Sequence, residues 1–287
     1  MCDICGCDDD AVPTAMNLQT GKPISLDSHS HQMQHRRALA TGHGHLHEHV
    51  HSDGTRHVHA HHGPHHHAAP SGLVDIETRI LAKNDALAAD NRAWLAEQQV
   101  LAINLMGAPG AGKTALLERT IRDIGAQMSL FVLEGDQATL NDGERIRAAG
   151  APVIQVNTGT GCHLDADMLA RSMKELHPTR RSIMVIENVG NLVCPALFDL
   201  GERRRVVVLS ATEGDDKPLK YPHMFRAADL VLLNKIDLLP YVEFDAVRAI
   251  ANARSLNPDV SVMRVSARTG EGLPDWYDWL QLELRNA

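Results

Sequence analysis

Val100-Leu-Ala-Ile-Asn-Leu-Met106 runs directly into Gly107-Ala-Pro-Gly110-Ala111-Gly112-Lys113-Thr114, so an apolar stretch meets a glycine-rich loop. The loop matches G-x-x-x-x-G-K-[ST] without a gap, between a predicted strand and a predicted helix. Glycines let backbone N–H groups close around phosphate oxygens, and a helix N-terminus adds positive potential. We therefore predict a P-loop in which Lys113 contacts the β- and γ-phosphates and the Thr114 hydroxyl ligates Mg²⁺. The alternative is a glycine-rich turn without a ligand.

Outward from this loop, apolar runs alternate with segments of helical periodicity. The runs lack polar alternation, which is typical of a parallel sheet that is covered on both faces. An amphipathic helix is expected from Leu73, and residues 273–284 form a closing helix. We predict an α/β P-loop fold with a mainly parallel sheet between two layers of helices, its strands at 100–106, 130–133, 153–156, 183–186, 206–209, 230–233 and 260–265.

The N-terminal quarter has a different composition. Residues 1–28 form a cysteine-rich head, and residues 29–67 hold fifteen of the 18 histidines with few large apolar side chains. The tract has too little apolar surface to offset the loss of conformational entropy on folding. We therefore predict that it is disordered in the absence of metal. Residues 68–72 read as a linker and 73–287 as the nucleotide-binding domain with its leading helix.

Charge and composition exclude several classes of function. The 287 residues contain 28 Lys and Arg against 36 Asp and Glu, and no basic stripe of the kind that nucleic-acid binding requires. No apolar run approaches the ~20 residues of a membrane span. The acidic, cysteine-rich start is unlike a signal peptide, so we expect a cytoplasmic protein. Its five cysteines then point to metal ligands or buried thiols instead of disulfides.

Two further segments indicate which base is bound. Asn234-Lys235-Ile236-Asp237 follows an apolar strand and resembles the guanine-reading N-K-x-D motif of G proteins. Asp237 can accept from both N1–H and the 2-amino group of guanine, whereas adenine would leave the carboxylate unpaired. Ser266-Ala267 resembles the loop that supports the base in the same proteins. GTP is therefore favoured over ATP.

Acidic residues at two strand ends are candidates for magnesium and catalysis. Glu187-Asn188-Val189-Gly190 resembles the D-x-x-G switch with Glu in place of Asp, so Glu187 would hold Mg²⁺ or its water and Gly190 would meet the γ-phosphate. Asp136 is a further candidate for Mg²⁺ or for positioning water, the alternative being a solvated loop carboxylate. Lys113, Asp136 and Glu187 are the predicted catalytic residues. No water-positioning glutamine or arginine finger stands out, so we expect slow intrinsic hydrolysis.

Thiols suggest two metal sites. Cys2, Cys5 and Cys7 place three thiolates within six residues, a set that suits soft or borderline ions such as Ni²⁺. If Met1 is removed, the α-amine of Cys2 could complete a square-planar set, and the alternative is a reactive tail. Cys162-His163 and Cys194 both lie beyond the carboxyl ends of predicted strands, the edge that also carries the nucleotide. We predict a metal site there whose fourth ligand is water or a second subunit.

The histidine tract offers many neutral imidazoles to Ni²⁺, Zn²⁺, Cu²⁺ or Co²⁺. An expression tag is the alternative, but this tract is internal, interrupted and irregular. The spacing does not name the metal. The candidate ligands with regular spacing are His43, His45, His47, His49, His51, His57, His59 and His61.

Together these motifs resemble the hydrogenase nickel-incorporation GTPases of the HypB family, in C-x-x-C-G-C, G-A-P-G-A-G-K-T, E-G-D, N-T-G-T-G-C-H-L, E-N-V-G-N-L-V-C-P and N-K-I-D. The resemblance implies GTP-dependent insertion of nickel into the large-subunit precursor of [NiFe]-hydrogenase, with a small zinc-containing nickel-delivery protein as partner. It also implies a high-affinity nickel site at Cys2, Cys5 and Cys7, and a nucleotide-regulated site for nickel or zinc at Cys162, His163 and Cys194. A GTP- or metal-dependent homodimer is a further implication, and the histidine tract suggests nickel storage.

Three other functions stay open at this point. A nickel storage or detoxification protein would use the histidine tract as its main feature. A metallochaperone GTPase for another nickel or cobalt enzyme would share the nucleotide domain without needing the cysteine-rich head. Phosphoryl transfer to a small molecule is a weaker alternative, because N-K-x-D motifs are unusual in such kinases.

Overall fold

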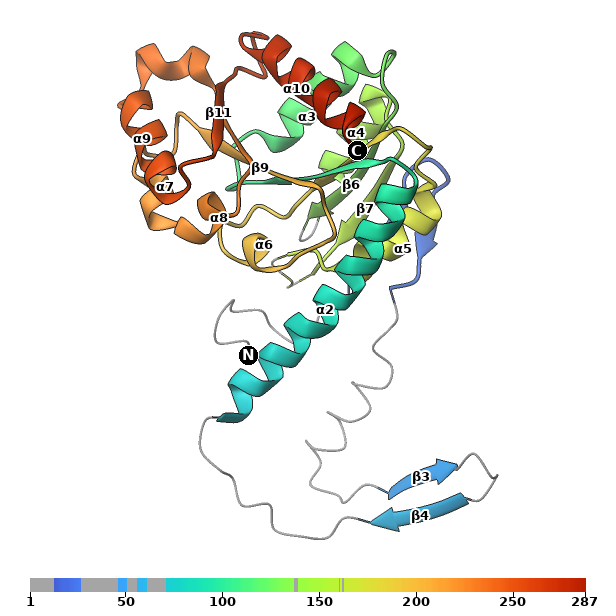
Figure 1. Cartoon of the computed structure of the whole chain (residues 1–287). Helices are drawn as coiled ribbons and strands as arrows, with labels where there is room; N and C mark the ends of the chain where they lie inside the picture. Colours follow the sequence, from blue (N-terminus) through green and yellow to red (C-terminus); the bar gives the residue numbers. More distant parts are fainter. Residues whose placement is uncertain are drawn as a thin grey trace. The chain divides into compact units, whose positions relative to one another are not determined.

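The computed structural model describes residues 13–26, 46–50, 56–60, 71–136, 139–159, 161 and 163–287. Strands and helices alternate along most of the chain (Figure 1). The strands are β1 (Thr14–Asn17), β2 (Lys22–Ile24), β3 (Leu46–Val50), β4 (Arg56–Ala60), β5 (Leu101–Met106), β6 (Leu130–Asp136), β7 (Val153–Asn157), β8 (Ile183–Glu187), β9 (Arg204–Ser210), β10 (Leu230–Asn234) and β11 (Ser261–Arg264). The helices are α2 (Ser71–Glu97), α3 (Lys113–Ile124), α4 (Asn141–Ala149), α5 (Ala166–Leu176), α6 (Cys194–Leu197), α7 (Lys217–Lys220), α8 (Pro222–Arg226), η1 (Ile236–Tyr241), α9 (Ala246–Leu256) and α10 (Leu273–Arg285).

Nine of the described strands form one sheet in the order β11-β10-β9-β5-β8-β6-β7-β1-β2. The ladders that join β5 to β11 are all parallel. Each strand expected from the apolar runs is present, and the predicted α/β fold is confirmed. The carboxyl ends of the parallel strands therefore lie along one edge, where ligands bind in open sheets of this kind.

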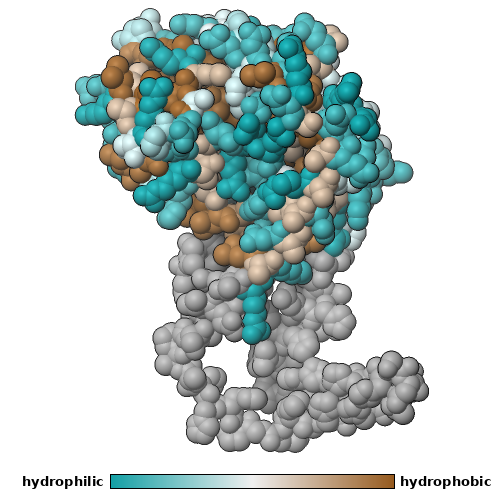
Figure 2. Space-filling model, viewed as in Figure 1, coloured by the Kyte–Doolittle hydropathy of each residue, from teal (hydrophilic) through white to brown (hydrophobic). Residues whose placement is uncertain are grey.

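Helices cover both faces of this sheet because its strands are apolar on both sides. Along β9, Val206 and Val208 pack with α3, α4 and α10, whereas Val207 and Leu209 pack with α8 and α9. On the face drawn in Figure 2, hydrophilic side chains predominate over the helices, with hydrophobic ones scattered among them. No described helix has both the length and the apolar composition that crossing a bilayer requires.

The hairpin of β1 and β2 was not predicted from the sequence. β1 pairs antiparallel with β7, so it extends the parallel sheet by an antiparallel edge. The Gln19 side chain fixes this edge: its Oε1 accepts from Val153 N at 3.0 Å, and its Nε2 donates to Ala151 O at 3.2 Å. Strands this short and polar carry little periodic signal, and their stability comes from pairing with residues far along the chain.

The described part of the chain divides into two compact units. Residues 13–25 and 80–287 belong to the first, and the second comprises residues from 26–79. In the second unit β3 and β4 form a two-stranded antiparallel sheet with His47 opposite His59 and His49 opposite His57. The alternation of histidine with other residues at 45–51 and 57–61 has the period of a strand. The other residues of 29–67 lie outside the described ranges, so the expectation of disorder without metal stays a prediction for the tract.

Candidate nucleotide-binding site

The P-loop, residues 107–114, turns the chain from β5 into α3. Gly112 is the N-cap residue of α3 and has φ +95°, and a Cβ there would lie 2.6 Å from Asn234 Nδ2. A larger residue would therefore be strained and would clash with the neighbouring loop. Lys113 is 7% exposed, and its Nζ donates to two carbonyl groups of the loop at 3.2 and 3.4 Å. Phosphate oxygens would give this ammonium charged acceptors in place of neutral ones.

The segment predicted to read the base lies against the P-loop. Asn234, the last residue of β10, donates from Nδ2 to Ala111 O at 3.0 Å. Lys235 has φ +61°, and its Nζ donates to Gly110 O at 2.6 Å. These two bonds join the P-loop to the end of β10 and the residue after it, so the proposed phosphate and base segments are positioned relative to each other within the chain.

A second set of bonds brings in the supporting loop after β11. Ala267 N donates to Asn234 Oδ1 at 3.2 Å, and Ser266 Oγ donates to Asp237 Oδ1 at 2.6 Å. The same hydroxyl oxygen accepts from Thr269 N at 3.1 Å. The structure thus brings together all the residues that the sequence assigned to base recognition, and the Asp237 carboxylate is oriented by Ser266.

Thr114 and Glu187 form the centre of the acidic side of the site. Thr114 Oγ1 donates to Glu187 Oε1 at 2.6 Å, from the first turn of α3 to the last residue of β8. Glu187 is 3% exposed, and its Oε2 has no hydrogen-bond partner among the described residues. Burial raises the pKa of Glu187 to about 7, while the Lys113 charge and the Thr114 hydrogen bond act in the opposite direction.

Glu134 is a residue of this site that sequence reasoning missed. It lies on β6 at the register position opposite Glu187 and is 2% exposed. Burial, followed by the charges of Glu187, Asp136 and Asp142, raises its pKa to about 9. Its Oε2 also lacks a partner in the part of the chain that the structure describes. The sequence could have indicated Glu134, because its carboxylate directly follows the apolar residues 130–133 of the same strand.

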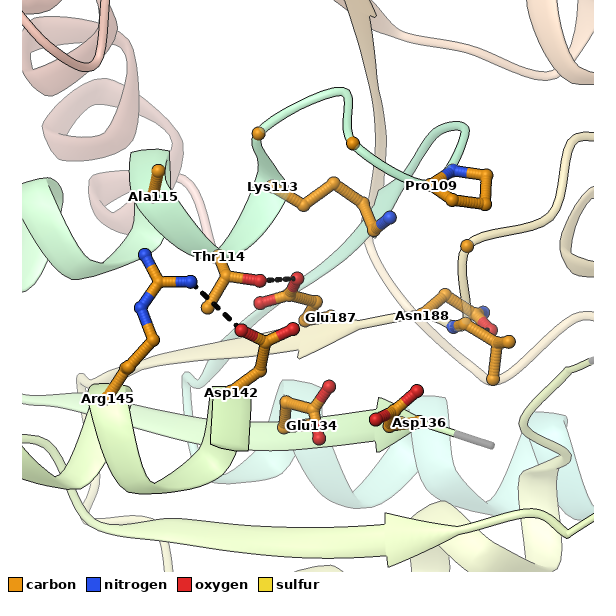
Figure 3. A pocket seen from close by; sticks show the side chains of 15 residues that line it. Pro109, Lys113, Thr114, Ala115, Glu134, Asp136, Asp142, Arg145, Glu187 and Asn188 are labelled. Carbon is orange, nitrogen blue, oxygen red and sulfur yellow. Dashed lines mark hydrogen bonds and ion pairs between the residues drawn. The ribbon is translucent and has the colours of Figure 1, made fainter. Parts of the chain in front are cut away.

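Lys113, Thr114, Glu134 and Glu187 all line one cavity of about 360 Å³. Figure 3 shows the carboxylates of Glu134, Asp136, Asp142 and Glu187 gathered between the P-loop and β6. Asp142 and Arg145 of α4 form an ion pair at 2.9 Å. Sequence reasoning missed both residues, although their spacing of about one helical turn could have indicated the pair. Asp136 Oδ2 accepts from both the amide and the hydroxyl of Thr139, at 3.1 and 2.6 Å.

Gly190 closes the cavity beside the P-loop. A Cβ at this position would lie 3.0 Å from Pro109 Cγ, so a side chain would press on the loop. Asn188, which the sequence analysis did not single out, also lines the cavity and is 1% exposed. Gly190 therefore lies against the P-loop, and its approach to a γ-phosphate stays a prediction.

The described residues include only part of the predicted metal sites. His163 is half-buried and stacks on Phe198 with ring centroids 3.8 Å apart, and desolvation lowers its pKa to about 4. Cys194 is buried at the start of α6. Cys162 lies outside the described residues, as do Cys2, Cys5, Cys7, His43, His45, His51 and His61, whereas His47, His49, His57 and His59 lie on β3 and β4. Within the described ranges no three or more His, Cys, Asp or Glu side chains are grouped closely enough to hold a metal ion.

This combination of fold and site defines a class, the P-loop nucleotide-binding proteins with a parallel sheet and a separate base-binding loop. Residues 101–264 match the family model "CobW/HypB/UreG, nucleotide-binding domain". The chain is 54% identical over 228 residues to the hydrogenase maturation factor HypB of Azotobacter chroococcum, covering 78% of this chain and 75% of that one. It belongs to the HypB family, as the motifs indicated.

Two solved structures agree with this assignment. HypB from Archaeoglobus fulgidus is 43% identical and superposes with a TM-score of 0.67 over 71% of this chain and 100% of that one. HypB from Helicobacter pylori, solved in complex with nickel, is 35% identical with the same TM-score, over 71% of this chain and 96% of that one.

Proposed function

We propose that this chain is a GTP-hydrolysing nickel metallochaperone of the cytoplasm that binds nickel and helps insert it into [NiFe]-hydrogenase during maturation. The observation that carries the proposal is that one P-loop both lines an acidic cavity with the Thr114–Glu187 pair and is hydrogen-bonded to the base-reading segment that begins at Asn234. Family membership supports the biological role, since relatives are named hydrogenase maturation factors and one HypB is described in complex with nickel.

Guanine selection follows from the bonds around Asp237. Its Oδ1 accepts from Ser266, which fixes the plane of the carboxylate and leaves acceptor capacity for N1–H and the 2-amino group of guanine. Adenine offers an acceptor at N1 and no 2-amino group, so the carboxylate would lose both bonds. Asn234 and Lys235 hold the loop against Ala111 and Gly110 and so keep the base at a set distance from the phosphates.

The acidic side suits a hard divalent cation. Glu187 presents a buried oxygen without a partner beside the Thr114 hydroxyl, and such oxygens are the ligands that Mg²⁺ prefers. Mg²⁺ would neutralise charge on the β- and γ-phosphates when bound. Lys113 would bind the same phosphates, Gly190 would approach the γ-phosphate, and Asp136 would orient water. Arg145 lines the cavity but is already paired with Asp142 and Glu118, so it is not free to stabilise charge on the phosphates. Intrinsic hydrolysis is therefore expected to be slow.

Nickel is the cargo in this proposal. Cys2, Cys5 and Cys7 would form the tight site, and Cys162, His163 and Cys194 a second site for Ni²⁺ or Zn²⁺ whose affinity depends on the nucleotide. The low pKa of His163 supports this role, because the neutral imidazole is the form that binds metal. The histidine tract would store further nickel. The pairing of His47 with His59 and of His49 with His57 supports storage, because it brings four candidate ligands onto two neighbouring strands.

The proposed partners are a small zinc-containing nickel-delivery protein, the hydrogenase large-subunit precursor and a second copy of this chain, joined in the presence of GTP or metal. The test is transfer of radioactive nickel from the full chain to the precursor, with GTP, GDP or a non-hydrolysable GTP analogue. The proposal predicts transfer that is fastest with GTP. Equal transfer with all three nucleotides would contradict it. Unchanged hydrogenase activity but lower nickel tolerance in cells lacking residues 29–67 would separate storage from delivery.

A further inference from the structure

The loop that carries His163 is bonded at its beginning to β6. Thr158 N donates to Asp136 O at 2.8 Å, and Thr158 Oγ1 lies 2.6 Å from Gly161 O and 3.3 Å from Asp136 O. Thr158 is 1% exposed. The start of the loop is therefore tied to the main chain of an acidic residue that lines the nucleotide cavity.

The end of the loop is bonded to β8. Leu164, the residue after His163, donates from its backbone N to Asn188 Oδ1 at 3.3 Å. Its side chain lies flat on Gly135 of β6, where a Cβ would come 2.9 Å from Leu164 Cδ1. Only glycine at position 135 allows this approach, so the loop end rests on both strands that supply cavity carboxylates.

Asn188 is held in one orientation. Its Oδ1 also accepts from Val189 N at 3.0 Å, and its Nδ2 donates to Asn104 Oδ1 at 3.2 Å. Asn104 in turn donates to Glu202 Oε1 at 3.2 Å. In a buried network of this kind each group depends on its neighbours, and a broken bond is costly because no water replaces it. The side chain therefore cannot rotate independently of the backbone at 188–189.

We propose that Asn188 is the positioning residue that links the nucleotide to the proposed metal site. Asn188 directly follows Glu187 and precedes Gly190 by two residues, so a nucleotide-dependent shift of this segment moves its amide. The bond to Leu164 N passes that shift to the backbone adjoining His163. The inference rests on the proposed function and deepens it, since it names the residue through which the two sites are coupled.

The experiment uses the full chain with Cys2, Cys5 and Cys7 replaced by Ala, which leaves Cys162 and Cys194 as its only cysteines. Nickel–thiolate charge-transfer absorbance then reports on the second site and is blind to histidine-bound nickel. Titrations with Ni²⁺ are compared in GDP and in a non-hydrolysable GTP analogue, each with Mg²⁺. In the parent chain the two affinities should differ by about 5- to 150-fold. In Asn188→Ala that ratio should fall by about 3- to 30-fold.

Asn91→Ala is the matched control. Asn91 is likewise a buried asparagine, and its Nδ2 donates to two carbonyl oxygens, of Ala166 and Leu200, but it is not among the residues that line the cavity. It should lose stability yet keep the ratio. Asn188→Asp retains the acceptors for Leu164 N and Val189 N but loses the donor to Asn104 Oδ1, so it should retain only part of the coupling.

The outcomes are separable. If Ni²⁺ affinity depends on the nucleotide equally in the parent chain and in Asn188→Ala, the inference is overturned and the proposed function stands. If Ni²⁺ affinity in the parent chain does not depend on the nucleotide, the coupling itself is overturned. If Asn188→Ala fails to fold, hydrogen exchange at the Leu164 amide of the parent chain decides: a rate that changes between GDP and the GTP analogue supports the inference, and identical rates overturn it.

Discussion

The two ends of the proposed nucleotide site, the base-reading segment at residues 234–237 and the acidic cavity beside the P-loop, differ in how far their polar groups are satisfied. At the base end, Asn234, Lys235 and Asp237 each form a hydrogen bond within the chain, and these bonds join the P-loop to the loops after β10 and β11. At the acidic end, Glu134 and Glu187 each bury an oxygen without a partner among the described residues. One end is assembled in advance, and the other is destabilised until a cation or a proton arrives.

This difference separates recognition from chemistry. Under the proposed function, preformed bonds would let the base end select guanine at little conformational cost. The unpartnered carboxylates make the acidic end sensitive to what occupies it, as expected where a site must respond to the phosphate state of its nucleotide. We therefore expect substitutions at the two ends to have different signatures, in hydrolysis, in base selectivity and in the dependence of stability on pH.

The largest effect is expected at Lys113, which serves the phosphates between both ends. Lys113→Ala removes the one P-loop ammonium, so the rate of GTP hydrolysis in steady-state phosphate release should fall at least about 100-fold. Nickel binding at Cys2, Cys5 and Cys7 should be intact in a competition titration. Joint loss of hydrolysis and of tight nickel binding would contradict separate sites.

Asp237→Asn tests the base end. The amide offers one acceptor in place of a carboxylate, so two charge-assisted bonds to guanine are lost and GTP affinity should fall by about 100-fold or more. Equilibrium binding of GTP and ITP is the measurement, because inosine retains N1–H but lacks the 2-amino group. The wild-type chain should prefer GTP, and the variant should distinguish the two poorly. Ser266→Ala, which removes only the orienting hydroxyl, should weaken GTP binding less. A variant that still binds GTP tightly and selectively would contradict the assigned role.

Glu134→Gln tests the acidic end through pH. The pKa of Glu134 is raised to about 9 in the folded chain, so the unfolded chain binds fewer protons between about pH 4.5 and 9. By linkage, the stabilising contribution is complete below pH 4.5 and is lost as pH rises towards 9. Thermal unfolding without nucleotide should therefore show a Tm that decreases with pH less steeply in Glu134→Gln than in the wild type. Glu144→Gln, at an exposed position, should retain the wild-type slope.

The smallest effect is expected away from both ends. Arg147 pairs with Glu144 at 2.8 Å on the outer side of α4, with both side chains about half exposed. Arg147→Ala should change the free energy of unfolding by less than about 1 kcal/mol, because solvent screens such pairs. Arg145→Ala, on the same helix but beside the cavity, should alter GTP hydrolysis as well. Chemical denaturation and a hydrolysis assay on both variants are the measurements. A fall in GTP hydrolysis in Arg147→Ala as large as that in Arg145→Ala would contradict the prediction.

The parts of the fold that were predictable have local signals. The strand before the P-loop, the loop itself and the segment at Asn234 are contiguous motifs whose chemistry needs those residues at those spacings. β1 and β2 were missed because their stability depends on pairing with β7, more than a hundred residues away. The short-range periodicity of a segment does not indicate which distant strand it pairs with.

The site was predictable to a similar extent. Thr114 and Glu187 were each singled out because they belong to motifs, and the structure joins them by a hydrogen bond. Glu134 lies in a strand and acquires its importance from the register opposite Glu187. Asn188 was quoted only as part of a switch motif. Its contact with Leu164 arises from tertiary packing, and no sequence spacing expresses it.

A preassembled base end and a cation-dependent acidic end would together make a guanine-specific hydrolase. The most direct measurement is single-turnover hydrolysis of radiolabelled GTP and ATP by the full chain, with Mg²⁺ and after its removal by chelation. We expect GTP to be hydrolysed only with Mg²⁺, and ATP not to be hydrolysed under either condition. Equal hydrolysis of ATP, or GTP hydrolysis that persists without Mg²⁺, would contradict it.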